Sequence, residues 1–366
     1  MTMQVSDDVQ LLELMLQDSR DVPELYKPTN YWANYEKKFI PELYSLGLKN
    51  FRRRKNSVLE SFGAVDVCQP SRIDIGKLKI FNNRFINHAL FKKILSPLNS
   101  VLNKLFPISN LYDIEREDLR RLVYTLVQLY SKETPAKSLA NLTVSMVGNP
   151  EDIFKMHEKQ YTMRMLNCYR RYAYCSRYIN FDTIETVVEL GCGHGAQVEV
   201  IKKLHPHICF LLFDLSPQLY VCEQYLKTIF SEAVISYRDT RSMKNLPTDW
   251  KGKIFIFGAA KFPLLEKIKI DLFWNAASFQ EMEPPVVQNY LKYINQQAGS
   301  VFLQQVMGGK EKAKKKGMPG VLEQTKLEHY RRFLSNFNLI DLSPSLVAPR
   351  LSKGDFYMDS FWKRCC

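Results

Sequence analysis

The stretch TVVELGCGHGA at residues 186–196 decides the fold of this 366-residue chain. An apolar run ends at Leu190, glycines follow at Gly191, Gly193 and Gly195, and a helical pattern begins after them. Glycines at such a bend allow backbone angles and a close ligand approach that a side chain would prevent. A strand, a glycine bend and a helix in this order hold a nucleotide-containing cofactor at the helix N-terminus.

Short apolar runs alternate with helical stretches from residue 183 onward. This alternation predicts a mostly parallel sheet with helices on both faces. The predicted strands span residues 186–190, 209–215, 234–239, 271–277, 300–306, 337–346 and 356–363. Only a turn-rich segment separates the last two, so we expect them to pair as a hairpin at the sheet edge. The sequence thus predicts a seven-stranded, Rossmann-like α/β fold.

The first half of the chain reads mainly as helices. Apolar residues recur every three or four positions in residues 30–48 and again in 115–132, which predicts one helix in each stretch. Between them, residues 71–86 alternate apolar and polar side chains, which predicts a small hairpin.

A polar segment punctuated by proline and glycine, residues 134–150, reads as a linker. A helix is expected after it, from about Pro150 to Tyr178. We therefore divide the chain into two regions. We expect residues 1–149 to form a mainly helical region that serves as a substrate-binding lid or a dimerisation surface. Residues 150–366 form the cofactor-binding domain.

Composition narrows the location and the partners. The apolar fraction of 46% suits a globular core, and no run of apolar residues is long enough to cross a bilayer. The eight cysteines show no metal-binding spacing and fit reduced thiols in the cytoplasm. The net charge is +13, but its lysines and arginines are dispersed apart from residues 51–55 and 308–317. We expect no membrane span, and the dispersed charge disfavours a nucleic-acid partner. A homodimer is left open.

Three kinds of cofactor compete for the glycine bend. A Walker phosphate loop requires a lysine after the glycines, and none follows here. A dinucleotide fingerprint fits better, because GCGHGA matches its glycine spacing and Asp214 follows at the distance expected of a ribose-binding acid. Glu189 argues against it, since a carboxylate beside the bend repels a pyrophosphate.

Carboxylates at the ends of successive predicted strands favour a positively charged cofactor. Glu189 would face the sulfonium and ammonium groups of S-adenosylmethionine. Asp214 would take its ribose hydroxyls, and Asp239 would meet its adenine amino group. Together with the glycine bend and the reversed last strand of the hairpin, these acids indicate a class I methyltransferase. The product would be S-adenosylhomocysteine, and a nicotinamide cofactor is the alternative.

Three segments resemble those of the sugar O-methyltransferase family: VVELGCGHGAQVEVI from residue 187, FLLFDLSPQLYVCEQYL from 210 and DLFWNAASFQEMEPPVVQNYLKYI from 271. The aromatic-rich helices after Tyr31 are also similar to the opening of that family. The resemblance implies S-adenosylmethionine-dependent methylation of a sugar hydroxyl in a glycan, nucleotide-sugar or glycosylated metabolite. The acceptor itself would be a small molecule or a glycan.

The acceptor hydroxyl needs a base or an orienting group. Glu281, in the loop after the fourth predicted strand, is the first candidate, although it also suits the start of the next helix. His194 lies in the glycine bend, and His157 would close the pocket from a helix above it. Asn275, on the fourth strand, is predicted to contact the cofactor.

Other readings stay open from the sequence. A divalent metal would need Asp271, Glu281 and Glu283, but Asp271 begins its strand, so no metal is predicted. The aromatic stripe from Tyr31 to Phe51 would stack on sugar rings or form core. The rival functions are methylation of another small molecule or peptide on oxygen or nitrogen, RNA methylation, and a binding module with a retired site.

Overall fold

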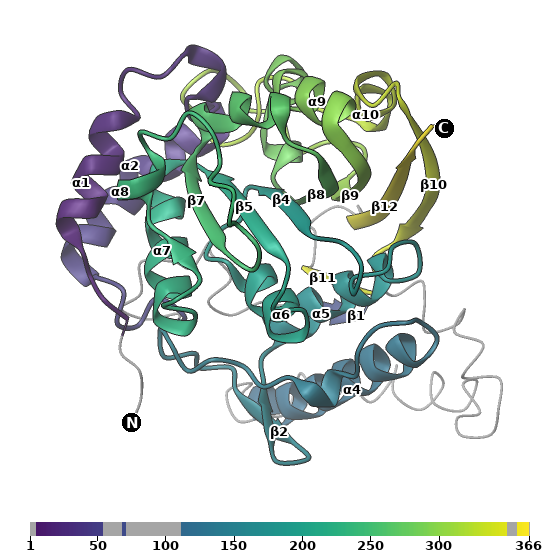
Figure 1. Ribbon diagram of the computed structural model, residues 1–366. Coiled ribbons are helices and arrows are strands. Elements are labelled where there is room, and N and C mark those ends of the chain that lie inside the picture. The colour runs from purple at the N-terminus through teal and green to yellow at the C-terminus, as the bar shows by residue number, and fades with distance from the viewer. Residues whose placement is uncertain (1–4, 54–67, 71–110, 350–356, 366) are drawn as a thin grey trace.

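The computed structural model describes residues 5–53, 68–70, 111–349 and 357–365. Within them, the main sheet has eight strands in the order β10-β12-β9-β8-β4-β5-β7-β6 (Figure 1). They are β4 (Thr186–Leu190), β5 (Cys209–Asp214), β6 (Val234–Ile235), β7 (Ile254–Gly258), β8 (Ile270–Ala276), β9 (Ala298–Val306), β10 (Phe337–Pro344) and β12 (Tyr357–Arg364). The hairpin predicted at 71–86 lies outside the described residues.

Strand direction confirms the predicted fold class. Strands β4 to β9 pair in parallel, whereas β12 runs antiparallel to both of its neighbours, β9 and β10. With the short β6 set aside, the seven long strands taken in chain order stand in the order 3-2-1-4-5-7-6. The strand order reverses between β4 and β8, and ligands of doubly wound sheets bind at such a switch point. The predicted terminal hairpin is present as β10 and β12.

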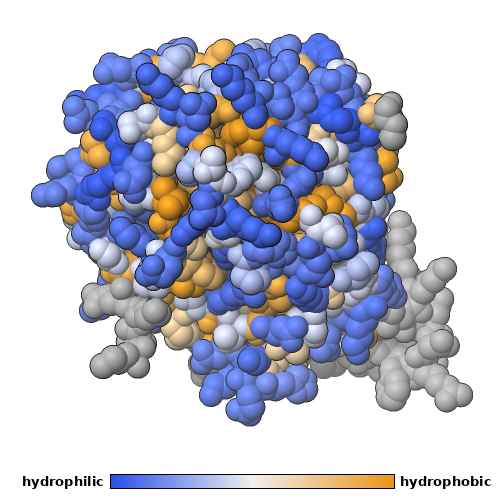
Figure 2. All heavy atoms as spheres, viewed as in Figure 1, coloured by the Kyte–Doolittle hydropathy of each residue, from blue (hydrophilic) through white to orange (hydrophobic). Residues whose placement is uncertain are grey.

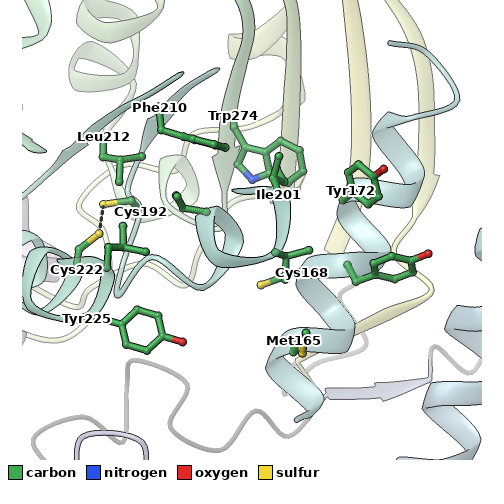
Figure 3. Close-up of a cluster of buried hydrophobic side chains, with 14 of the residues drawn as sticks. Met165, Cys168, Tyr172, Cys192, Ile201, Phe210, Leu212, Cys222, Tyr225 and Trp274 are labelled. Atoms are coloured by element: carbon green, nitrogen blue, oxygen red, sulfur yellow. Dashed lines mark hydrogen bonds between the residues drawn. The ribbon is translucent and has the colours of Figure 1, made fainter. Parts of the chain in front are cut away.

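Helices cover both faces of this sheet (Figure 1). One face packs against α5, α6 and α7, and the other against α9, α10 and η5. Their bounds are α5 (Met163–Cys175), α6 (Ala196–Leu204), α7 (Ser216–Ile229), α9 (Pro284–Gln297), α10 (Leu327–Phe333) and η5 (Ala259–Lys267). Successive residues of β5 alternate between the two faces: Phe210 and Leu212 join the first core cluster, and Leu211 and Phe213 join the second. Figure 3 shows Phe210, Leu212 and Trp274 packed over the helices of the first face.

The N-terminal helices share the first of these cores. They are α1 (Val9–Asp18), α2 (Asn30–Leu46) and α4 (Leu111–Lys132). A short 3-10 turn between α1 and α2, η1 (Glu24–Tyr26), instead places Tyr26 in the second core. Both helices predicted from the periodic stretches are thus confirmed, and Gly47 is the C-cap of α2. Phe39 and Leu43 of α2 are buried, while Figure 1 places α1 and α2 beside α7 and α8. The helices therefore lie against the main sheet and reach the site described below.

One predicted strand is wrong and one was missed. Only Val234–Ile235 of the run 234–239 is a strand, because Ser236 then caps a short helix, α8 (Tyr237–Thr240), by accepting a hydrogen bond from the Arg238 N–H. Asp239 therefore lies on a helix and does not end a strand. The third long strand is β7, Ile254–Gly258, whose residues Ile254 to Phe257 are all buried.

The helix predicted from Pro150 to Tyr178 begins later than expected. A hairpin comes first, formed by β2 (Phe154–Met156) and β3 (Lys159–Tyr161), with His157 and Glu158 in left-handed backbone conformations at its turn. Helix α5 begins only after Thr162, whose hydroxyl accepts a hydrogen bond from the Met165 N–H. That N-cap is the start signal that the apolar periodicity concealed.

A further small sheet pairs β1 (Cys68–Pro70) with β11 (Val347–Pro349). Figure 2 shows a largely hydrophilic surface in the view of Figure 1, with apolar side chains in narrow areas between polar ones. No helix in the described ranges has the length and apolar character of a membrane span.

Candidate active site

The glycine bend is shaped by contacts that exclude a side chain. Gly191 has a φ of 75°, and a Cβ there would come within 2.4 Å of the Ser278 side chain. Gly195, with a φ of 85°, is the N-cap of α6, where a Cβ would overlap Leu226. Between them, Cys192 points to Cys222 of α7, and the two sulfurs lie 3.6 Å apart (Figure 3). The bend is therefore packed on the loop after β8 on one side and on α7 on the other.

Asp214 ends β5 and faces the bend, as predicted. Its carboxylate accepts hydrogen bonds from the Gly193 N–H at 2.9 Å and the Leu215 N–H at 2.8 Å. Burial raises the pKa of Asp214 to about 7, although both backbone donors oppose the shift. Each carboxylate oxygen keeps a lone pair for a ligand hydroxyl.

Glu189 is the penultimate residue of β4, and its side chain is buried. It makes no hydrogen bond or ion pair with the residues that the structure describes. Burial raises the pKa of Glu189 to about 8, the Arg171 guanidinium opposes that shift, and the Asp214 carboxyl adds to it. Buried polar groups are nearly always hydrogen-bonded in folded proteins. A buried carboxyl without a protein partner therefore indicates a ligand contact.

A cavity of about 430 Å³ opens beside Asp214, within the size range of small-molecule sites. Its floor is formed by the carboxyl ends of β5 and β7, including Gly258 and Ala259. Its roof comes from the N-terminal segment and consists of Leu16, Asp18, Ser19, Val22, Tyr26, Pro28 and Glu36.

An ion pair and hydrogen bonds hold the roof against the main sheet and its helices. The Asp18 carboxylate accepts hydrogen bonds from Arg241 at 2.7 Å and from the Tyr237 hydroxyl at 2.9 Å. The Ser216 hydroxyl donates to the Met15 carbonyl at 2.9 Å. The N-terminal helices thus form one wall of the cavity.

Sequence reasoning suggested a lid or a dimerisation surface in residues 1–149 but identified neither the roof residues nor the β7 end of this cavity. The apolar run before Gly258 is the signal that could have found β7. No comparable signal identifies Glu36, because its position in the helical pattern is that of an ordinary surface charge.

Glu281 belongs to η6 (Phe279–Glu281), after β8. Its carboxylate lies 3.1 Å from the Lys310 ammonium, and its backbone carbonyl accepts a hydrogen bond from the Thr29 hydroxyl at 2.9 Å. Burial raises the pKa of Glu281, while Lys310 and hydrogen bonds from Tyr31 and Trp32 oppose the shift. This acid therefore stands between the sheet, the N-terminal helix α2 and the basic loop.

The aromatic stripe of α2 divides between core and site. Phe39 and Leu43 are buried, whereas Tyr31, Trp32 and Tyr35 stay partly or fully exposed and pack against one another with ring centroids 5.0–5.7 Å apart. The Lys310 ammonium lies 5.0 Å from the centre of the Tyr31 ring. These rings form an aromatic wall beside Glu281.

Asn275 stabilises the site through hydrogen bonds to three neighbouring segments. Its amide donates to the Leu190 carbonyl at 2.8 Å, and its oxygen accepts from the Phe279 N–H at 3.0 Å and from the Gln305 amide at 2.7 Å. It thus ties the end of β4 to the loop after β8. Ala277, in that loop, has a φ of 66°, a strained conformation for a residue other than glycine that is typical of functional sites.

The structure does not bring three of the predicted residues to the cavity. His194 is buried between Phe51 and Tyr225, with ring centroids 5.6 and 5.3 Å away, so its imidazole is turned into the core. His157 is exposed at the β2–β3 turn, which Figure 1 shows away from α1 and α2. Asp239 is exposed on α8. Neither histidine is placed to act as a base at this site.

The potential metal ligands are likewise apart. Among the described residues, no three His, Cys, Asp or Glu side chains form a group suited to a metal ion. Asp271 stands at the start of β8, where its carboxylate accepts the Glu185 and Thr186 N–H groups at 2.8 and 3.0 Å. Glu283 accepts the Leu322 N–H at 3.0 Å.

No protein-family model matches the chain, and no curated protein matches it. Among solved structures, the chain is similar to the magnesium protoporphyrin IX methyltransferase of Synechocystis PCC 6803 with bound S-adenosylmethionine. The identity is 10%, the TM-score is 0.37, and the match covers 56% of this chain and 80% of that chain. An O-methyltransferase from a trans-AT polyketide synthase of Brevibacillus brevis, in complex with S-adenosyl-L-homocysteine, gives 15% identity, coverage of 54% and 72%, and a TM-score of 0.37. The mitomycin 7-O-methyltransferase MmcR has 12% identity, with 55% of this chain and 57% of that chain covered and a TM-score of 0.34. The fold assignment rests on the strand order of the sheet itself.

Proposed function

We propose that the chain is an S-adenosylmethionine-dependent O-methyltransferase. The observation that carries this proposal is the pair of acids at the glycine bend: Asp214 ends β5 with lone pairs to spare, and Glu189 is buried without a protein partner. Carboxylates on both sides of the bend attract a positively charged cofactor and repel the pyrophosphate of a dinucleotide. The reversed last strand supports the same conclusion.

The proposed binding mode assigns one cofactor group to each part of the site. Asp214 accepts hydrogen bonds from the ribose hydroxyls, and Glu189 holds the ammonium group. The cavity between α8 and the β7 end, beside Gly258 and Ala259, receives the adenine. In this proposal those two residues take the role that the sequence suggested for Asp239. When bound, S-adenosylmethionine supplies an electrophilic methyl group on its sulfonium.

Glu281 is the proposed base or orienting group for the acceptor. Its raised pKa suits a carboxylate that takes the hydroxyl proton while the acceptor oxygen gains the methyl group. Lys310, 3.1 Å away, stabilises the ionised form that can accept this proton. Asn275 acts by positioning the loop that carries Glu281, and we assign it no direct cofactor contact.

We further propose a sugar hydroxyl as the acceptor, in a glycan, a nucleotide-sugar or a glycosylated metabolite. The resemblance of the sequence to sugar O-methyltransferases supports this assignment. The aromatic wall of Tyr31, Trp32 and Tyr35 beside a carboxylate and an ammonium offers both an apolar face and hydrogen-bonding groups to a sugar ring. Incubation with labelled methyl donor and separate fractions of sugar nucleotides, glycans and RNA tests the acceptor, and label in the RNA fraction alone would refute it.

The cofactor assignment is tested by melting scans. S-adenosylhomocysteine should raise the Tm of the chain by mass action, and NAD should not. Asp214→Ala should abolish the shift, because the ribose hydroxyls lose their acceptor. Asp239→Ala is the matched control and should keep the full shift, since its side chain is exposed on α8. A Tm rise with NAD, or a full response of the Asp214 variant, would overturn the assignment.

A further inference from the structure

Besides Asp214 and the Arg241-bound Asp18, the cavity is lined by a third carboxyl, that of Glu36 from the N-terminal helix α2. Its side chain lines the cavity and makes no hydrogen bond or ion pair with the described part of the chain. Its neighbours on α2 are engaged otherwise: Trp32, one turn earlier, contacts the Glu281 carboxyl, and Lys38 pairs with Glu42. An acid that faces a cavity without a protein partner is available to a ligand.

The charge around Glu36 favours a cationic ligand. Burial raises the pKa of Glu36 to about 7, and the Asp214 carboxyl adds to the shift. The two basic residues that line the cavity have other partners, because Arg241 is bound to Asp18 and the Lys261 ammonium donates to the Met243 carbonyl at 3.2 Å. Two carboxyls that line one cavity, each with its pKa raised by burial, both ionise more readily when a positive charge lies between them.

Helix α2 places Glu36 next to the expected position of the cofactor's sulfonium. Trp32 contacts Glu281, the proposed acceptor-side acid, and Glu36 lies one helical turn further on, beside the proposed ribose acid Asp214. In S-adenosylmethionine the sulfonium is bonded to the ribose carbon and directs its methyl group to the acceptor. A cofactor bound as proposed above therefore has its sulfonium between Asp214 and Glu281, on the side that α2 covers.

We propose that Glu36 contacts the sulfonium side of the donor and makes the site prefer S-adenosylmethionine over its neutral product, S-adenosylhomocysteine. This assignment rests on the proposed function and gives the N-terminal region a part in the cofactor site. The product lacks the positive charge, so it gains nothing from the Glu36 carboxylate. The preference helps the product to leave after transfer and the next donor to replace it.

Calorimetric titration of the full chain with S-adenosylmethionine and, separately, with S-adenosylhomocysteine tests the assignment. Glu36→Gln should weaken donor binding by about tenfold and leave product binding nearly unchanged, because it removes charge and keeps shape. Glu36→Asp keeps the charge and should keep most of the preference for the donor. Glu42→Gln, on the same helix but outside the cavity, is the matched control and should bind both ligands as the wild type does.

The possible outcomes separate this assignment from the proposed function. If Glu36→Gln weakens both ligands equally, or neither, while the wild type binds both, the sulfonium contact is refuted and the methyltransferase assignment stands. If the wild-type chain binds neither ligand, the proposed function falls and this assignment falls with it. Circular dichroism and the Tm of each variant show that the change in binding does not come from unfolding.

Discussion

The donor side and the acceptor side of the candidate site are built in different ways. On the donor side, Glu189, the glycine bend and Asp214 lie within one strand–turn–helix–strand unit, and the backbone itself shapes the bend. On the acceptor side, Glu281 meets Lys310 from the loop after β9 and Tyr31 from α2. The hydrogen bond from Thr29 to Glu281 joins residues 252 positions apart.

This contrast teaches where each half is vulnerable. A backbone-shaped half fails when a side chain is added to a glycine, because the strand and the helix on either side of the bend are fixed by the core. On the acceptor side, which distant segments assemble, a substitution removes the function of one side chain and leaves the others in place. Substitutions on the two sides should therefore differ in kind as well as in size.

The largest effect is expected from Gly191→Ala. The new Cβ would lie 2.4 Å from the Ser278 side chain, and a φ of 75° costs a residue with a side chain about 1–2 kcal/mol before any overlap is counted. We expect the free energy of unfolding to fall by more than this amount and donor binding to be lost. Urea denaturation and calorimetric titration with S-adenosylmethionine measure the two effects.

Gly308→Ala is the matched control for that change. Gly308 follows β9 on the acceptor side, and a Cβ there would meet nothing within 4 Å. Its variant should keep both stability and donor affinity. Unaltered donor binding by the Gly191 variant would show that the bend does not shape the site.

The sequence revealed most of the sheet because its strands are short buried runs between helices. Residues 186–190 and 271–277 match β4 and β8 closely for this reason. The prediction failed where a polar residue changed the local structure: Ser236 caps a helix inside the run predicted as a strand, and Thr162 starts α5 after a hairpin. A single capping side chain can end or start an element inside an apolar pattern, and it produces no repeating pattern by which the sequence could reveal it.

The sequence suggested both acids of the donor side of the candidate site, but only Glu281 on its acceptor side. Glu189 and Asp214 were proposed because each stands close to the end of a predicted strand. The approach of Glu36 to Asp214 and the pairing of Lys310 with Glu281 escaped that reasoning, because they depend on how α2 and a loop fold back over the sheet. His194 misled for the opposite reason: its place in the bend is right, but its ring packs between Phe51 and Tyr225.

A smaller effect, confined to catalysis, is expected from Glu281→Gln on the acceptor side. The amide cannot accept the hydroxyl proton, so we expect kcat to fall about 10²-fold or more, the usual contribution of a general base. The affinity for S-adenosylmethionine should stay nearly unchanged. Transfer of labelled methyl groups to the identified acceptor measures kcat, and calorimetry measures donor affinity.

His157→Ala is the control for this variant, because its imidazole is exposed at the distant β2–β3 turn. It should retain wild-type kcat. The pH profile adds a second readout: a base at Glu281 gives a rate that falls at low pH in the wild type, and the Gln variant should lose that limb. An unchanged kcat in the Gln variant would assign proton removal to another group.

The smallest effect concerns the stability of the unliganded donor side against pH. Burial raises the pKa of Glu189 from 4.5 to about 8 and that of Asp214 from 3.8 to about 7. Between the unfolded and the folded pKa, the folded chain holds protons that the unfolded chain has released, so stability falls as pH rises. From pH 6.5 to 8 we expect the free energy of unfolding to decrease, by on the order of 1 kcal/mol per pH unit for each group still protonated.

Glu189→Gln isolates the contribution of one acid to this slope. Glu36, whose pKa burial raises to about 7, and Lys202, whose pKa burial lowers to about 8, titrate in the same window in both proteins. The difference between the two slopes therefore isolates Glu189. The Gln variant has no proton to release and should unfold with a shallower pH dependence, measured by urea denaturation at several pH values. An identical slope in both proteins would mean that Glu189 is already ionised, and the donor side would then attract its cationic ligand without the release of a proton.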